Sequence, residues 1–160
     1  MSETPEYTPE DKERKDAPKI EGWRMSGAVL ATCNVGGEEK ILLGKRLKDP
    51  NRGKWVLPGG GMRVGEDGKL AAEREVLEEA GVEIENVENF IITDHQEETL
   101  GKKIVWVTAE IKNPSDIRGG DDLGEPTLFS RDELLRLDGI SDIVRPVLEE
   151  AGWLEGPGFT

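Results

Sequence analysis

Three glutamates, Glu75, Glu78 and Glu79, occupy positions i, i+3 and i+4 of a segment that reads EREVLEE. On a helix of about 3.6 residues per turn these positions share one face, so three negative charges lie close together. Hard divalent ions such as Mg²⁺ prefer oxygen ligands and commonly bridge carboxylates to phosphates. The pattern therefore predicts a metal-dependent site for phosphate chemistry. A solvated acidic helix face is the alternative, and it is the more common one when such a run stands alone.

The residues around these glutamates favour the metal site. The segment from residue 60 to residue 82 fits the pattern G-x5-E-x7-R-E-U-x-E-E-x-G-U, in which U is aliphatic. The fixed places are filled by Gly60, Glu66, Arg74, Glu75, Val76, Glu78, Glu79, Gly81 and Val82. This stretch resembles the Nudix box, the motif of hydrolases that cleave nucleoside diphosphates linked to another moiety X. Nine constrained positions at fixed spacing make a chance match improbable.

The resemblance implies a role for each acidic residue. Glu78 and Glu79 are expected to be the principal metal ligands, together with the backbone carbonyl of Gly60. Glu75 is expected to be a further ligand or the base that orients the attacking water. Asp122 is the favoured candidate for one more acid, which relatives place in a late loop. The implied cofactor is Mg²⁺, with Mn²⁺ as the alternative.

Two further residues of the box have supporting roles in this interpretation. Arg74 lies i, i+4 from Glu78, so its guanidinium can orient the acidic side chains, and a purely structural ion pair is the alternative. Glu66 precedes the helix and is expected to be an outer ligand or a hydrogen-bonding strut.

Basic and aromatic residues outside the helix are the candidates for substrate binding. Arg46 resembles an arginine found in many relatives nine residues before a tryptophan, here Trp55. Lys45 and Arg63 are the other candidate phosphate clamps, although ordinary surface charge explains both equally well. Relatives often carry Glu where this chain has Arg63, which leaves the number of metal ions open. Trp55 is a candidate for stacking on a base.

Two aromatic side chains elsewhere in the chain have less specific patterns. His95 is the only histidine and follows a predicted strand, so an exposed loop residue is the simpler interpretation and a general base the alternative. Trp106 falls in a predicted central strand and is expected in the core, with stacking on a base as the alternative.

The hydrophobic pattern predicts an α/β fold, a sandwich with a mixed β-sheet between helices, and the resemblance implies the same fold. Leu70 and Leu77 are spaced i, i+7, so we expect them to form the apolar side of the helix, opposite Glu75 and Glu79. The glycines after Pro58 are expected to form a loop. Predicted strands are 25–35, 40–45, 55–57, 82–93, 103–112 and 126–130, and predicted helices are 68–80, a short one opened by Ser130, and 140–151.

The composition limits the domain organisation and the partners. Residues 1–20 are poor in aliphatic side chains and predict a disordered tail, residues 21–155 a single domain, and residues 156–160 a C-terminal tail. No apolar run of about 20 residues is present, so no membrane span is expected, and without a targeting peptide a cytoplasmic location follows. The formal net charge of −13 argues against nucleic acid as the partner and leaves a small nucleotide. The resemblance also implies a homodimer as an option.

These observations lead to one leading function and two alternatives. We expect hydrolysis of a (d)NTP to the monophosphate and pyrophosphate, because sequence features of the more specialised relatives are absent. ADP-ribose or another nucleotide sugar is the second substrate class. A module that senses nucleotides without hydrolysing them is the alternative of another kind, and the intact set of acidic residues argues against it.

Overall fold

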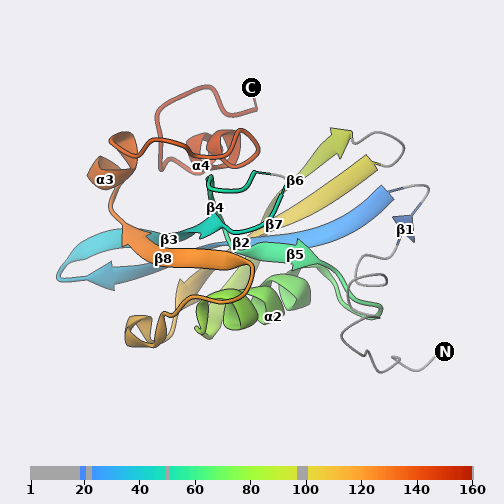
Figure 1. The fold of residues 1–160 in the computed structure, drawn as a ribbon, viewed down its shortest axis with the longest axis horizontal. Coiled ribbons are helices and arrows are strands. Elements are labelled where there is room, and N and C mark those ends of the chain that lie inside the picture. Colours follow the sequence, from blue (N-terminus) through green and yellow to red (C-terminus); the bar gives the residue numbers. More distant parts are fainter. Residues whose placement is uncertain (1–18, 21–22, 50, 97–100, 160) are drawn as a thin grey trace.

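The computed structural model describes residues 19–20, 23–49, 51–96 and 101–159. The predicted N-terminal tail lies outside this part of the chain, except for its last two residues. Within the described residues, eight strands form one sheet (Figure 1). The strands are β1 Lys19–Ile20, β2 Trp23–Val35, β3 Glu38–Arg46, β4 Trp55–Val56, β5 Gly59–Gly61, β6 Ile84–Gln96, β7 Gly101–Ile111 and β8 Leu123–Phe129.

The sheet is mixed, as the sequence predicts. Its main path runs β4-β3-β2-β7-β6, while β1 and β5 pair with β2, and β8 pairs with β3. Strands β2 and β7 are parallel, and the other pairs are antiparallel. The predicted hairpin joins β2 to β3 through Gly36 and Gly37, whose φ angles of 61° and 87° suit glycine. Strand β7 lies between β2 and β6, which confirms the expected central strand.

Helices cover both faces of the sheet (Figure 1). Helix α2, Gly68–Ala80, packs on one face, where its alanines and Val76 meet Val29, Val107 and their neighbours. Helices α3, Arg131–Leu135, and α4, Arg145–Glu150, pack on the other face in a second apolar cluster. This is the predicted α/β/α sandwich. None of the helices among the described residues is long and apolar enough to cross a membrane.

Local signals set both ends of α2 where the sequence predicts them. The carboxylate of Asp67 accepts the N–H of Leu70 at 2.9 Å, which caps the first turn. Gly81 ends the helix in the left-handed conformation, with φ 75°, and its N–H donates to the carbonyl of Leu77. Ser130 likewise caps α3, in a reciprocal pair with Glu133.

The predicted apolar side of α2 is wrong. Leu70 and Leu77 are 51% and 45% exposed, whereas Glu75 and Glu79 are 4% and 8% exposed. The reason is the close approach of the helix to β2: a Cβ on Gly27 would lie 2.5 Å from the carbonyl oxygen of Gly68. Such an approach needs small side chains, so the face that carries the alanines packs on the sheet and the two glutamates lie on the same side.

Most strands begin or end within about three residues of the predicted bounds, and three further differences change an element's type or extent. Gly59–Gly61 is a short strand on β2 rather than a loop. Helix α4 begins at Arg145 instead of Ile140, because Ser141 donates its N–H to the carbonyl of Trp55 and holds residues 140 and 141 against β4. Residues 156–159 of the predicted C-terminal tail fold back on α4, where the N–H of Gly158 donates to Glu149.

Candidate active site

The two buried glutamates of α2 face the glycine strand β5. Glu79 Oε1 accepts the N–H of Gly59 at 2.9 Å. A Cβ on Gly60 would lie 2.5 Å from the carboxylate carbon of Glu75, so only glycine fits there. The three-glycine strand therefore lets two carboxylates lie directly against a backbone that carries no side chains.

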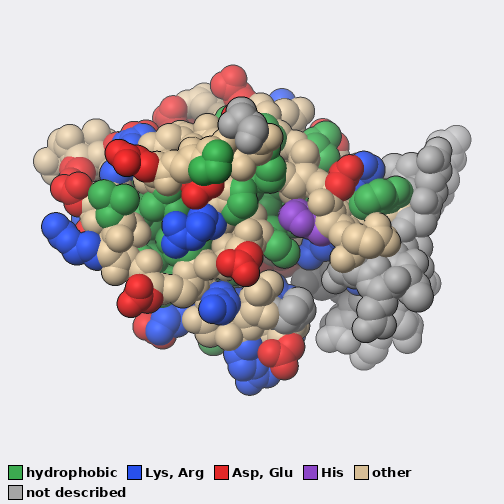
Figure 2. Space-filling view, turned by 90° about the horizontal axis from the view of Figure 1, so that it is seen from above, with side chains coloured by type: hydrophobic (Ala, Val, Ile, Leu, Met, Phe, Trp, Pro, Cys, Tyr) green, Lys and Arg blue, Asp and Glu red, His purple; other side chains and the backbone are tan. Residues whose placement is uncertain are grey.

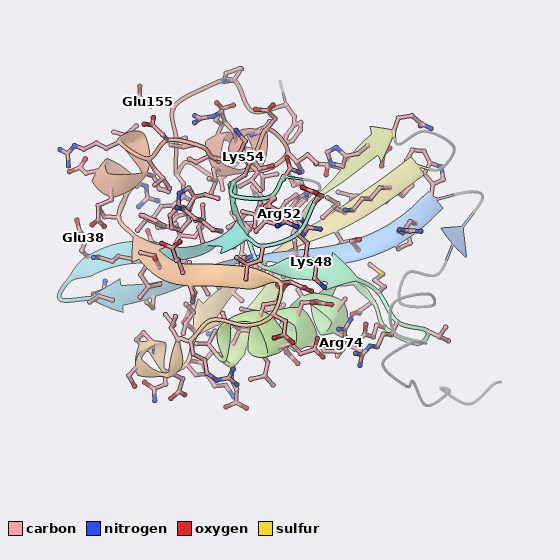
Figure 3. The ribbon with its side chains drawn as sticks, viewed as in Figure 1. Glu38, Lys48, Arg52, Lys54, Arg74 and Glu155 are labelled. Atoms are coloured by element: carbon pink, nitrogen blue, oxygen red, sulfur yellow. The ribbon has the colours of Figure 1, made fainter. Side chains whose placement is uncertain are left out.

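Arg74 connects the acidic residues to the glycine strand. Its Nε donates to Glu66 at 2.7 Å, one Nη donates to Glu75 at 2.8 Å, and the other Nη donates to the carbonyl of Gly61 at 2.8 Å. Burial would lower the pKa of the guanidinium, but Glu66 and Glu75 outweigh burial and raise it. Figure 3 shows Arg74 on α2, below the sheet. A planar guanidinium can satisfy this set of acceptors, which a lysine cannot.

Glu66 is a partner of Arg74 in this structure. Both of its oxygens accept hydrogen bonds from Arg74, and Oε1 also accepts the N–H of Arg63 at 2.8 Å. Burial would raise the pKa of Glu66, but these bonds hold it below its usual value. The geometry therefore fits the hydrogen-bonding strut, one of the two roles considered for this residue.

Glu79 lies in the opposite electrostatic environment. The pKa of Glu79 is raised to about 8, mainly by burial and also by the negative charges of Glu75 and Asp122. The hydrogen bond from the N–H of Gly59 and the charge of Arg46 lower it by less. A carboxyl group with such a pKa takes up a proton near neutral pH unless a cation lies beside it. The environment of Glu79 thus matches a site built for positive charge.

The donors around α2 suit a hard divalent cation. They are the carboxylates of Glu75, Glu78 and Glu79 and the carbonyl of Gly60, all oxygen atoms. Within the described residues, no three acidic, histidine or cysteine side chains are already gathered as a set of metal ligands. Arg74 contacts Glu75 and Glu78, at 2.8 and 3.3 Å, so these carboxylates would have to turn toward a cation.

A cleft of about 990 Å³ opens above the glycine strand, on the face of the sheet opposite α2. Figure 2 views the molecule from this side and shows hydrophobic side chains among charged ones. The backbone of β5 and Glu79 line it from the α2 side. Its apolar lining is formed by Ala28, Val56, Leu57, Ile104, Trp106, Leu123, Ile143 and Val144.

The predicted substrate-binding residues separate into two groups. Arg46 lines the cleft, and so does Asp122, the candidate metal ligand, which Lys48 contacts at 2.7 Å. Lys45 and Trp55 do not line it: the ammonium of Lys45 lies 5.4 Å from the Trp55 ring, which packs edge-to-face on Phe129.

Arg63 also lies outside the cleft lining, with its guanidinium 3.5 Å from Glu78.

Arg24 and Lys102 line the cleft although no sequence pattern indicates them, and two residues considered from the sequence lie beside them. His95 lies within β6, rather than in a loop, and lines the cleft together with Arg24 and Lys102. Trp106 is buried, as predicted, yet its ring also lines the cleft. These residues come together through the parallel pairing of β2 with β7 and the antiparallel pairing of β7 with β6, and the first of these has no local signal in the sequence.

Comparison with known proteins assigns the family. Residues 23–151 match the model of the NUDIX domain. The chain belongs to the Nudix family. Nudix hydrolase 26, chloroplastic, of Arabidopsis thaliana is 33% identical over 98 residues, which cover 61% of this chain and 37% of that protein. The putative 8-oxo-dGTP diphosphatase 2 of Mycobacterium tuberculosis is 36% identical over 61 residues, or 38% of this chain and 39% of that protein.

The Nudix fold also appears in a solved structure at low sequence identity. The NUDIX domain of Shewanella oneidensis NrtR, complexed with ADP ribose, has a TM-score of 0.72 at 16% identity, covering 91% of this chain and 97% of that chain. The chain spans about two fifths of the length of the two curated relatives above.

Proposed function

We propose that this Nudix protein hydrolyses the diphosphate link of a nucleoside diphosphate-X substrate in the presence of Mg²⁺ or Mn²⁺. The leading substrate class is a (d)NTP, cleaved to the monophosphate and pyrophosphate. One observation carries the proposal: Glu75 and Glu79 are buried against a glycine strand whose other side opens into a nucleotide-sized cleft.

The acidic residues of α2 have the chemistry that such a reaction needs. Glu75, Glu78 and Glu79 with the carbonyl of Gly60 would hold a divalent cation, which supplies charge neutralisation at the diphosphate and a lower pKa for the attacking water. Arg74 keeps Glu75 beside β5. In the reaction one water oxygen bonds to phosphorus, the bridging P–O bond breaks, and a carboxylate accepts the water's proton.

The cleft accounts for the remainder of the substrate. Its volume is at the upper end of the range typical of small-molecule sites, which leaves room for a whole nucleotide. Arg46 lines it near the acidic end and would pair with the phosphates. The apolar wall of Trp106, Ile143 and Val144 would receive the base.

The two substrate classes have different support. The (d)NTP class is supported by the relative named as a putative 8-oxo-dGTP diphosphatase. ADP-ribose or a nucleotide sugar is the second candidate, supported by the size of the cleft and by the ADP ribose bound to a domain of similar fold.

The test is a substrate screen joined to a matched pair of variants. We expect Mg²⁺- or Mn²⁺-dependent release of a nucleoside monophosphate when (d)NTPs, ADP-ribose, nucleotide sugars and dinucleoside polyphosphates are compared. Glu79→Gln should lower turnover by orders of magnitude. Glu73→Gln, an exposed residue of the same helix with the same charge change, should retain it. Unchanged turnover in Glu79→Gln contradicts the ligand set, and tight binding without turnover of any substrate supports a nucleotide sensor instead.

A further inference from the structure

Three basic or titratable residues form a row across the floor of the cleft. Arg24 of β2 pairs with Lys102 of β7, and Lys102 pairs with His95 of β6. Directly paired residues on neighbouring strands point to the same face of a sheet. All three line the cleft, so the row, called here the basic row, faces its interior.

Buried groups fix the imidazole at one end of the basic row. The indole N–H of Trp106 donates to Thr93 Oγ1 at 2.9 Å, and the same oxygen lies 2.8 Å from His95 Nε2. Trp106 is 2% exposed and Thr93 is 7% exposed. The indole N–H can only donate, so it occupies one lone pair of the Thr93 hydroxyl. This restricts the orientation in which the hydroxyl can hydrogen-bond to the imidazole.

The basic row lies in an acidic chain. Acidic residues exceed basic ones by 13, yet Arg24 and Lys102 lie side by side with the histidine in the cleft. Asp94, the acidic residue next to His95, is held by Lys103 at 2.9 Å. Among the described residues of the lining, the other acidic ones are Glu79 of α2 and Asp49 and Asp122 of the loops beside β3 and β8.

The basic row is separate from the acidic site of α2. Gly60 pairs with Gly27 of β2, three residues from Arg24 along the strand. At about 3.3 Å per residue, this places the basic row roughly 10 Å along the strands from Gly60. The two phosphates of a single diphosphate link cannot occupy both places at once.

We propose that Arg24, Lys102 and His95 form a second anion site, which binds a phosphate group carried by the substrate beyond the scissile diphosphate. The inference rests on the proposed function and narrows its substrate class to nucleoside diphosphate derivatives with an additional phosphate. Arg24 and Lys102 supply charge and donors to the phosphate oxygens, and His95 supplies a hydrogen bond from a fixed position. The fold brings these residues together from three strands.

The single histidine provides a direct probe of the site. The imidazole C–H signals of His95 are followed by NMR in metal-free protein while inorganic phosphate is added at constant ionic strength. We expect a saturable shift of these signals with phosphate and none with chloride. Lys102→Gln should weaken the apparent phosphate affinity about tenfold, because one charge-assisted contact is lost.

Lys112→Gln is the matched control, since it removes the same charge from an exposed residue just past the other end of β7. It should bind phosphate like the unaltered protein. A phosphate response that is absent in the unaltered protein, or equal in Lys102→Gln and Lys112→Gln, overturns the proposal. Circular dichroism of each variant checks that the sheet is retained.

A kinetic arm separates this proposal from the proposed function. Two ratios of kcat/KM are compared between variants, each for a pair of substrates that differ by one phosphate. The pairs are 2′-phospho-ADP-ribose with ADP-ribose, and NADPH with NADH. If either ratio shows that the unaltered protein prefers the substrate with the added phosphate, Lys102→Gln should lower that ratio. Lys112→Gln should leave both ratios unchanged. No hydrolysis of any substrate defeats the proposed function alone, because the NMR arm still reports on the anion site. Hydrolysis with identical ratios in all variants defeats the anion site alone.

Discussion

Gly60 and Glu75 are in direct contact between β5 and α2: a Cβ on Gly60 would lie 2.5 Å from the Glu75 carboxylate. The absence of a side chain at one residue thus decides where the carboxylate of another can lie. The helix approaches closely enough for this because its buried face is otherwise made of small residues.

This contact predicts that Gly60→Ala displaces the Glu75 carboxylate without unfolding the chain. A displacement of about 1 Å in a catalytic group can lower turnover roughly 100-fold, and we expect a loss of that size. Steady-state kinetics and a thermal melt measure it. Gly119→Ala is the control, because its Cβ would lie 3.6 Å from the nearest atom, and its turnover should be unchanged. Full activity in Gly60→Ala contradicts the role of the contact.

Arg74→Lys tests the guanidinium that joins Glu66, Glu75 and Gly61. An ammonium cannot span these acceptors, so buried carboxylate oxygens lose partners, at a cost of about 1–3 kcal/mol. We expect a lower unfolding midpoint in urea and weaker Mg²⁺ binding by calorimetry. Arg52→Lys, in an exposed pair 3.7 Å from Asp49, should change neither. Equal results for the two variants contradict an organising role for Arg74.

Glu79 predicts a pH dependence of stability in metal-free protein. Its pKa is raised from 4.5 to about 8 in the folded state, so between these pH values the folded chain binds more protons than the unfolded chain at this residue. The free energy of unfolding contributed by Glu79 therefore falls as the pH rises through this window. Glu79→Gln removes the effect.

In EDTA, Glu79→Gln should melt several degrees above the unaltered protein at pH 8.5, and the difference should narrow toward pH 5. Differential scanning calorimetry at a series of pH values measures this. Glu73→Gln should follow the unaltered protein throughout. A difference that stays constant with pH excludes the titration of Glu79 as its cause.

Because the leucines of α2 are exposed, we expect the fold to tolerate polar substitutions at these residues. Leu77→Gln should change the free energy of unfolding by less than about 0.5 kcal/mol, since the side chain is 45% exposed. Ala72→Leu, on the fully buried side, should destabilise by about 1–3 kcal/mol through overpacking against the sheet. Urea unfolding measures the free energy of unfolding of both variants. A larger decrease for Leu77→Gln than for Ala72→Leu would indicate that the side with Leu70 and Leu77 is the buried one.

Local chemistry explains how much of this fold the sequence predicts. The bounds of α2 depend on Asp67 and Gly81, which act within one turn, and the β2–β3 hairpin depends on two adjacent glycines. The sequence indicates the wrong side of α2 as buried, because side-chain hydrophobicity favours Leu70 and Leu77, whereas the packing distance to β2 favours alanine. That distance depends on Gly27, which lies far away in the sequence.

The candidate site likewise combines residues that a short pattern indicates with residues that only the fold brings together. Glu75, Glu78, Glu79 and Arg74 belong to one helix, so their spacing alone indicates a shared site. Arg24, His95 and Lys102 belong to three strands, and the pairing of β2 with β7 joins residues about 80 positions apart. Such pairing is set by the whole sheet, and no short pattern contains it.

The sheet lies between α2, which carries the acidic residues, and most of the cleft. Successive side chains of each strand point alternately to these two sides. In β2 and β7, one set of alternate residues packs against α2, while the intervening set faces the cleft and the cluster of α3 and α4. The lining of the cleft can therefore be changed at every second residue of these strands while the packing against α2 is kept. Inserting one residue into β7 would exchange the two sets beyond the insertion, so the lining of the cleft and the packing against α2 would be lost together.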